Sequence, residues 1–214
     1  MGKITTILFD FDGTLMDTNS LIIKSWQHTF RTLGMEEKPV SEIMKSFGEP
    51  LAYTMQKLFP DRDVSEYVSV YRDFHRENFE EGIEIFPGMG GLVASLREKG
   101  YSTGVVTSRM AWSTALGLQK YNLTGSFDVV ITANDTEKHK PDPEPINVAL
   151  KKLGRPPGES LMVGDTKFDV LCAKNAGVKS VLVGWTEAFP ERERTGDSTP
   201  DYVIEKPEDL LKIL

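Results

Sequence analysis

The sequence predicts an α/β fold: a Rossmann-like, doubly wound parallel sheet with an inserted α-helical cap. Short apolar runs alternate with helical patterns along most of the chain, as expected when helices connect parallel strands. The runs are rich in Val, Ile and Leu and lack polar alternation, which is typical of strands covered on both faces. Residues 18–82 instead show helical patterns only. We therefore expect a core formed by residues 1–17 and 83–214 and a helical cap formed by residues 18–82.

The core elements are expected to alternate along the chain. A helix between two strands of one sheet makes a right-handed crossover, so these strands should lie parallel. The expected strands are residues 3–9, 101–107, 127–132, 160–164 and 179–184. The expected helices are residues 90–100, 111–123, 143–154, 167–177 and 207–214, and the polar stretch 186–201 should form a surface loop.

The cap is expected to contain four helices, because apolar residues recur three and four positions apart. Leu21 and Ser25 share one helical face, and Trp26 and Phe30 share another. The return to the core at residues 82–90 contains Gly and Pro and could act as a hinge. The helices are expected at residues 18–34, 39–48, 50–59 and 64–82.

The composition is that of an ordinary soluble protein of 214 residues, 39% hydrophobic and 27% charged. The net charge of −7 disfavours nucleic acid and anionic membranes as main partners, and no apolar run is long enough for a membrane span. There is no signal-peptide pattern, and Cys172, the only cysteine, should be buried and cannot form an internal disulfide. We expect a cytoplasmic protein, a monomer or weak homodimer, that binds neither nucleic acid nor membrane.

Two aspartates stand where the first expected strand ends. Asp10 and Asp12 follow apolar residues 7–9, and residues i and i+2 of an extended segment point to the same side. Ligands of open parallel sheets bind beyond the carboxyl ends of the strands, so both carboxylates can face one site. A divalent cation would offset their repulsion, and carboxylate oxygens suit Mg²⁺. Gly13 allows a tight turn after the pair, and the Thr14 hydroxyl can fasten the loop.

Two further segments offer groups that suit phosphate. Thr107 and Ser108 follow the second expected strand, where their hydroxyl and backbone N–H groups could bind phosphate oxygens. Lys140 stands directly before Pro141 in a loop that leads into a helix. Its ammonium group there would neutralise both phosphate and carboxylates.

A second acidic pair follows the expected strand at residues 160–164. Asp165 lies at the strand end, and Asp169 lies about one helical turn further on, so it can reach back to the same place. Each of these features has an ordinary explanation by itself: a turn, a capped helix, a solvated loop charge or a helix-dipole contact. Their occurrence at four consecutive strand ends favours one shared site.

The segments "DFDGTLMD", "VVTSR", "HKPDPEP" with Lys140, and "GDTKFD" resemble, in order and spacing, the four motifs of the haloacid dehalogenase (HAD) superfamily. The resemblance covers essentially the whole chain. It implies a Rossmann-like core and an aspartyl-phosphate mechanism. The helical insert resembles the small cap of the subgroup that contains phosphoglycolate phosphatase and β-phosphoglucomutase.

The resemblance also implies a role for each motif residue. Asp10 would be the nucleophile that attacks phosphorus. Asp12 would be the general acid that protonates the leaving oxygen, and then the base for the hydrolytic water. Thr107 and Lys140 would hold the transferring phosphoryl group. Mg²⁺ would be held by Asp10, the backbone carbonyl of Asp12, Asp165 and, through a water or through Lys140, Asp169.

The resemblance to the superfamily is compatible with several reactions, and individual residues of this chain distinguish between them. Asp12 argues against dehalogenation, which uses no such Asp pair and needs no Mg²⁺. Phosphonoacetaldehyde hydrolases use a cap lysine, for which Lys24 and Lys45 are candidates by residue type only, and a solvated helix face is the better interpretation for both. β-Phosphoglucomutases usually carry "ED" near the fourth motif, where this chain has "GDTKFD". A phosphatase is therefore favoured, with a phosphomutase as the alternative.

The substrate is expected to be a small phosphorylated metabolite. The segments around the first and third motifs resemble bacterial HAD-type pyrophosphatases, with phosphoglycolate phosphatases a near second. The cap segment "SFGEPL", residues 46–51, is similar to the loop that carries specificity in both. Pyrophosphate would need extra positive charge, which Arg109 could supply, although a surface position for Arg109 is equally compatible with the sequence. His28, His75 and His139 lack zinc-ligand spacing and are expected to be surface or capping residues.

Overall fold

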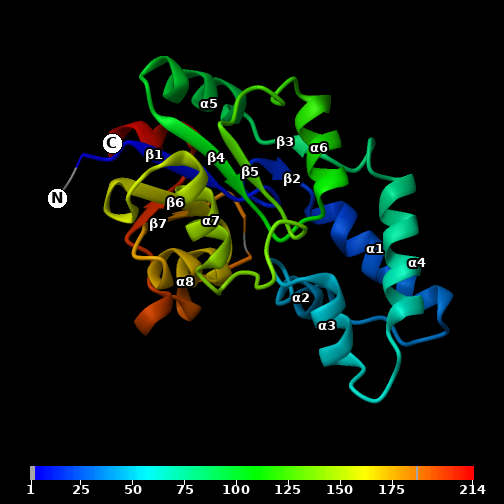
Figure 1. Ribbon diagram of the computed structural model, residues 1–214. Coiled ribbons are helices and arrows are strands. Elements are labelled where there is room, and N and C mark those ends of the chain that lie inside the picture. Colours follow the sequence, from blue (N-terminus) through cyan, green and yellow to red (C-terminus); the bar gives the residue numbers. More distant parts are fainter. Residues whose placement is uncertain (1–2, 187) are drawn as a thin grey trace.

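A computed structural model, which describes residues 3–186 and 188–214, has the α/β fold that the sequence predicts (Figure 1). Its main sheet is parallel and has the strand order β5-β4-β1-β6-β7-β8. β1 lies in the middle, so that Thr6 is opposite Ser102 of β4 on one side and Ser160 of β6 on the other. The strands are β1 (Thr6–Phe9), β4 (Ser102–Val106), β5 (Val129–Ile131), β6 (Ser160–Gly164), β7 (Lys179–Val183) and β8 (Tyr202–Ile204).

Helices cover both faces of the sheet, because successive strand residues point to opposite sides. Ile7 and Phe9 of β1 belong to one apolar layer, which packs against helices α5 and α6. Leu8 belongs to the other layer, which packs against α7 and α8 and includes the buried Cys172. The sheet is therefore doubly wound. The core helices are α5 (Met89–Glu98), α6 (Ala111–Lys120), α7 (Glu144–Leu153) and α8 (Lys167–Asn175).

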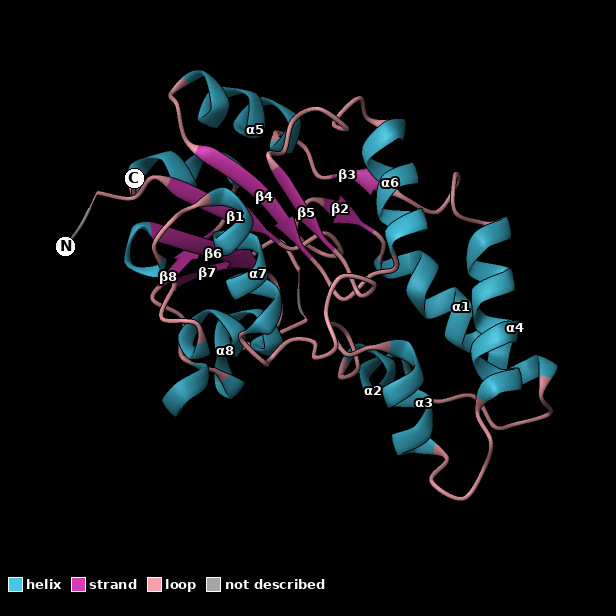
Figure 2. Cartoon of the chain, in the orientation of Figure 1, coloured by secondary structure: helices cyan, strands magenta, loops and turns pink. Residues whose placement is uncertain are grey.

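The inserted segment forms four helices that lie to one side of the sheet (Figure 2). Trp26, Phe30, Met55 and Tyr71 belong to an apolar cluster of their own, separate from the two layers on the sheet. This separate cluster is compatible with a division into core and cap, which stays a prediction. The helices are α1 (Asn19–Thr32), α2 (Val40–Met44), α3 (Leu51–Leu58) and α4 (Ser65–Glu77).

A short antiparallel ribbon connects the inserted helices to the sheet. Strand β2 (Met16–Asp17) pairs with β3 (Glu84–Ile85), so that Met16 lies opposite Ile85. The sequence predicted neither strand. The ribbon places the outgoing and returning chain side by side, next to the boundaries predicted for the cap.

The C-terminal part differs most from expectation. The predicted loop at residues 186–201, of which residue 187 is outside the described part, contains two 3₁₀ helices, η2 (Glu191–Glu193) and η3 (Gly196–Ser198). Phe189 in this loop is buried against Val170 and Leu182. Strand β8 was not predicted, and the helix predicted at residues 207–214 is a 3₁₀ helix, η4 (Pro207–Lys212). Residues 1–2 of the predicted core also lie outside the described part. Within the described residues, no helix has the length and apolarity of a membrane span.

Candidate active site

The predicted site residues meet at the carboxyl edge of the sheet. Asp10 follows β1, and its N–H group donates a hydrogen bond of 2.8 Å to the carbonyl oxygen of Val163 in β6. Thr107 follows β4, and its N–H group donates to Ile131 of β5 at 2.9 Å. Asp165 follows β6 directly. The sheet register therefore brings the ends of three strands, far apart in sequence, to one place.

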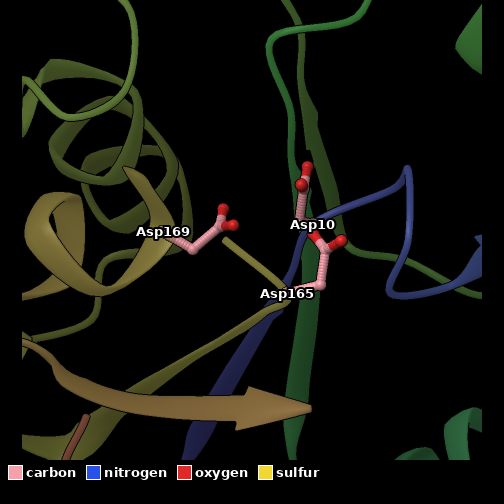
Figure 3. A group of neighbouring side chains, drawn as sticks. All are labelled: Asp10, Asp165 and Asp169. Carbon is pink, nitrogen blue, oxygen red and sulfur yellow. The ribbon is translucent and has the colours of Figure 1, made fainter. Parts of the chain in front are cut away.

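Three carboxylates, drawn in Figure 3, and one ammonium group form the centre of this site. Asp10, Asp165 and Asp169 are buried, and each can offer an oxygen within 4.8 Å of the others. Figure 3 shows the carboxylate of Asp169 reaching from its helix towards the other two. The Nζ atom of Lys140 lies 2.8 Å from Oδ1 of Asp10 and 2.6 Å from Oδ1 of Asp169. Lys140 is also buried, so this charge cluster is shielded from solvent.

The cluster contains three acidic groups and one basic group. Burial raises the pKa of Asp10 to about 7, with Lys140 opposing the shift. Burial, together with the charges of Asp169 and Asp10, raises the pKa of Asp165 well above its usual range. Burial would lower the pKa of Lys140, but its two carboxylate partners raise it by more, so the ammonium stays charged. Three acids facing one base leave a deficit of positive charge that a cation would fill.

The donor set fits a hard divalent cation. Oδ1 of Asp165 is buried without a hydrogen-bond partner, and so is Oδ1 of Asp10, whose contact with Lys140 is close but poorly aligned. Buried carboxylate oxygens without donors are costly unless something positive occupies the space between them. Oxygen-only ligands of this kind suit Mg²⁺.

Asp169 differs from the other two acids because both of its oxygens already have partners. Oδ2 accepts hydrogen bonds from the backbone N–H of Thr166 at 3.0 Å and from its hydroxyl at 2.6 Å, which caps helix α8. Oδ1 accepts from Lys140 at 2.6 Å. This arrangement favours the indirect role, through Lys140 or a water, over direct ligation.

Two glycines make the close approach of these carboxylates possible. Gly13 has φ +70°, and a Cβ atom there would lie 2.0 Å from Oδ2 of Asp165. A Cβ atom on Gly164 would lie 2.3 Å from Cβ of Asp169. Any larger residue at either position would displace an acid of the cluster. The hydroxyl of Thr14, which was expected to fasten the loop, is instead buried without a hydrogen-bond partner.

Asp12 lies beside the cluster and is held by two donors. Its Oδ1 accepts from the hydroxyl of Thr18 at 2.6 Å and from Nη1 of Arg109 at 2.7 Å. The side chain of Arg109 is only 7% exposed, so the surface position that the sequence left open for it is wrong. Its guanidinium carbon lies 5.4 Å and 5.0 Å from the ring centroids of Phe11 and Phe79.

The histidine prediction is wrong for His75. This residue of α4 is buried, and its Nε2 atom lies 2.8 Å from Nη2 of Arg109. It is buried because α4 turns Tyr67, Tyr71 and His75 towards the interior of the inserted helices at a spacing of four residues. That spacing is the sequence signal that could have identified it. His139 lines the cavity described next.

A cavity of about 300 Å³ opens above the nucleophile candidate, between the sheet edge and the inserted helices. Thr107 and Ser108 both line it, and the Ser108 hydroxyl is buried without a partner, which suits a phosphate oxygen. Lys140 does not line this cavity but lies against Asp10, which does. The lining also includes Asp12, Arg109, Met110, Trp112 and Asp165 from the core side and Ile22, residues 46–52, Tyr71, Arg72 and His75 from the inserted helices.

The fold and this site define a hydrolase of the HAD class. Residues 7–183 match the family described as haloacid dehalogenase-like hydrolase. The chain belongs to this family, and the predicted enzyme class is confirmed.

Two curated relatives and one solved structure are similar to this chain over nearly its whole length. The pyrophosphatase PpaX of Bacillus mycoides (strain KBAB4) is 39% identical to this chain over 215 residues, covering 99% of this chain and 97% of that protein. The pyrophosphatase PpaX of Anoxybacillus flavithermus is 39% identical over 212 residues, with the same coverage of 99% and 97%. Among solved structures, the haloacid dehalogenase-like family protein SP0104 from Streptococcus pneumoniae has a TM-score of 0.87 at 25% identity, covering 100% of this chain and 99% of that chain.

Proposed function

We propose that this chain is a divalent cation-dependent phosphatase that acts through an aspartyl-phosphate on Asp10. The observation that carries the proposal is the meeting of Asp10, Thr107, Lys140 and Asp165 at one sheet edge, next to a cavity. These residues come from four distant segments, and their chemistry is that needed to hold and attack a phosphoryl group. The match to a family of hydrolases supports the same conclusion.

The reaction has two displacements. An oxygen of Asp10 forms a bond to phosphorus as the bond from phosphorus to the leaving oxygen breaks, and Asp12 donates a proton to that oxygen. Water then attacks phosphorus, Asp12 accepts a proton from the water, and phosphate leaves with Asp10 regenerated. Oδ1 of Asp12 is occupied by Thr18 and Arg109, whereas its Oδ2 has no hydrogen-bond donor within the described residues. Oδ2 is thus the oxygen available for proton transfer.

The remaining residues bind and balance charge. Thr107 and Ser108 would donate to the phosphoryl oxygens, and Lys140 would neutralise them while fixed by Asp169. Asp10, the backbone carbonyl of Asp12 and Asp165 would hold a divalent cation such as Mg²⁺, which supplies positive charge against the phosphoryl oxygens.

The substrate that we propose first is pyrophosphate, with phosphoglycolate second. Both carry a second anionic group, and two guanidinium groups, those of Arg72 and Arg109, line the cavity. The predicted specificity segment, residues 46–51, lines it as well. The similarity to pyrophosphatases that are 39% identical over nearly the whole chain supports pyrophosphate as the first candidate.

We also propose that residues 18–82 act as a cap that moves relative to the core. The β2–β3 ribbon would be the hinge, because both connections to the cap pass through it. Closing of the cap would exclude water from the transferring phosphoryl group.

The first test is phosphate release by the wild-type protein and by Asp10→Asn, with Mg²⁺ and with EDTA. We expect the variant to lose about a thousandfold or more of the activity, because the nucleophile is gone, and EDTA to stop the wild type until Mg²⁺ is restored. Acid-quenched wild-type protein should carry a phosphoryl group on the peptide that contains Asp10. Wild-type rates from the variant would exclude Asp10 as nucleophile.

A matched control is Asp61→Asn, which changes an exposed aspartate of the inserted segment that does not line the cavity. It should retain activity. A phosphomutase would instead isomerise a sugar phosphate with little net phosphate release, so the assay with pyrophosphate, phosphoglycolate and sugar phosphates also separates that alternative. Undiminished turnover in EDTA would remove the cation from the proposal.

A further inference from the structure

His75 connects the inserted helices to the catalytic edge of the core. It lies on α4, whereas its partner Arg109 lies in the segment that follows β4. The 2.8 Å contact between Nε2 of His75 and Nη2 of Arg109 is partly buried, and His75 itself is buried. Arg109 in turn donates through Nη1 to Asp12. The guanidinium of Arg109 therefore bridges His75 of the cap and Asp12, the proposed acid–base residue.

The surroundings fix the tautomer of His75. An arginine can only donate, so Nε2 must be the acceptor in its contact with Arg109. Nδ1 lies 3.3 Å from the hydroxyl of Ser25, and that hydroxyl donates to the carbonyl oxygen of Leu21 at 2.7 Å. The hydroxyl oxygen is then free to accept, so Nδ1 carries the proton. Burial and the charge of Arg109 lower the pKa of His75 to about 3, so the ring is neutral near neutral pH.

The orientation of the Arg109 guanidinium depends on the acceptor that this neutral ring provides. Among the described residues, its two terminal nitrogens have Asp12 and His75 as acceptors, and its buried Nε has none. Removal of the acceptor on His75 would leave a second donor of this largely buried side chain without a partner. The guanidinium would then gain by turning away, because an unsatisfied buried donor is costly.

We propose that His75 is a positioning residue that completes the active site when the cap closes, by orienting Arg109 against Asp12 and towards the anionic substrate. This inference rests on the proposed phosphatase function. The acceptor belongs to the cap and the donor to the core, so the contact exists only while the two are docked. An open cap would leave Arg109 without one of its two acceptors.

The test compares two substitutions of similar size. The amide of His75→Gln can still accept a hydrogen bond from Arg109, whereas His75→Leu fills the space without an acceptor. We expect H75L to lower kcat for pyrophosphate about tenfold to a hundredfold, by the loss of an aligned group, and H75Q to recover most of it. The matched control His28→Leu, on cap helix α1 and stacked on Phe74, should keep kcat.

A second measurement does not depend on activity. Long-range ¹H–¹⁵N NMR of the wild-type protein should show His75 protonated at Nδ1 only. In the Arg109→Leu variant, the Nε2 resonance of His75 should shift because the donor is gone. Wild-type kcat in H75L, equal losses in H75L and H75Q, or a proton on Nε2 would each overturn the inference. If the wild type released no phosphate from any substrate, the proposed function would fail while the NMR experiment would still decide on the contact. Should H75L not fold, H75Q and the tautomer measurement decide.

Discussion

At the scale of single residues, the site depends on positions where the backbone must carry no side chain. Gly13 lies in the turn between Asp10 and the ribbon, with φ +70° and the carboxylate of Asp165 directly against it. From the sequence alone, the tight turn after the Asp pair is the only reason for this glycine. The structure adds the second reason, which is that the fourth motif packs onto the first.

We predict that Gly13→Ala lowers stability by about 1–3 kcal/mol and abolishes most activity, because the new Cβ strains the backbone and pushes Asp165 out of the cluster. The control is Gly34→Ala, which has φ +63° but no atom within 4 Å of the new Cβ. It should cost only about 1–2 kcal/mol of backbone strain and leave activity intact. Denaturant unfolding and phosphate release measure both effects. Equal activities of the two variants would contradict the steric argument.

Most of the candidate site could be predicted from sequence because its residues directly follow buried strands. Asp10, Thr107 and Asp165 stand where a parallel sheet ends, and ligands gather there. His75 could not be found in this way, because its role depends on how the cap packs against the core. The spacing of Tyr67, Tyr71 and His75 indicates that His75 faces inward, but only the tertiary contact reveals Arg109 as its partner.

At the scale of elements, the interior strands were predictable because both of their faces are buried and their sequences are continuously apolar. β8 was missed because it lies at the sheet edge, has three residues and leaves Val203 44% exposed. β2 and β3 have two residues each, which is too short for any periodic signal. β2 and β3 pair because the outgoing and returning connections of the inserted segment lie side by side. This long-range contact leaves no signal in either local sequence.

The separate apolar cluster of the cap leads to a prediction about local stability. Met55 is fully buried in the cap cluster, and Met162 is buried in the layer that joins the sheet to α7 and α8. Truncation of either to Ala should cost about 2–5 kcal/mol. We expect Met55→Ala to speed hydrogen exchange mainly in α1–α4, and Met162→Ala to speed it across the sheet. Uniform loss of protection in both variants would show that the cap and core unfold as one unit.

At the scale of the whole molecule, the charge cluster lies where β1, β6 and α8 meet. The repulsion among its buried acids opposes the docking of these elements, and Lys140 offsets only part of it. A bound cation would therefore stabilise the entire core as well as serve the reaction.

We predict that Mg²⁺ at about one hundred times its dissociation constant stabilises the wild-type protein by about 2.7 kcal/mol, since a ligand that binds only the folded state shifts the unfolding equilibrium. Thermal unfolding with Mg²⁺ and with EDTA measures this shift. Asp165→Asn should abolish it and should be about as stable as the wild type in EDTA, because the raised pKa of Asp165 already favours its uncharged form when no cation is bound. A cation effect that persists in this variant would place the cation elsewhere.

The central position of β1 has a consequence for how the chain is made. During synthesis the first strand leaves the ribosome long before either of its neighbours, since residue 6 pairs with residues 102 and 160. The cap, whose contacts are local, can acquire its structure while the strand that carries the nucleophile still waits for partners. We expect nascent chains that stop before β4 to hold a folded helical insert beside an exposed apolar strand, a species that chaperones would recognise.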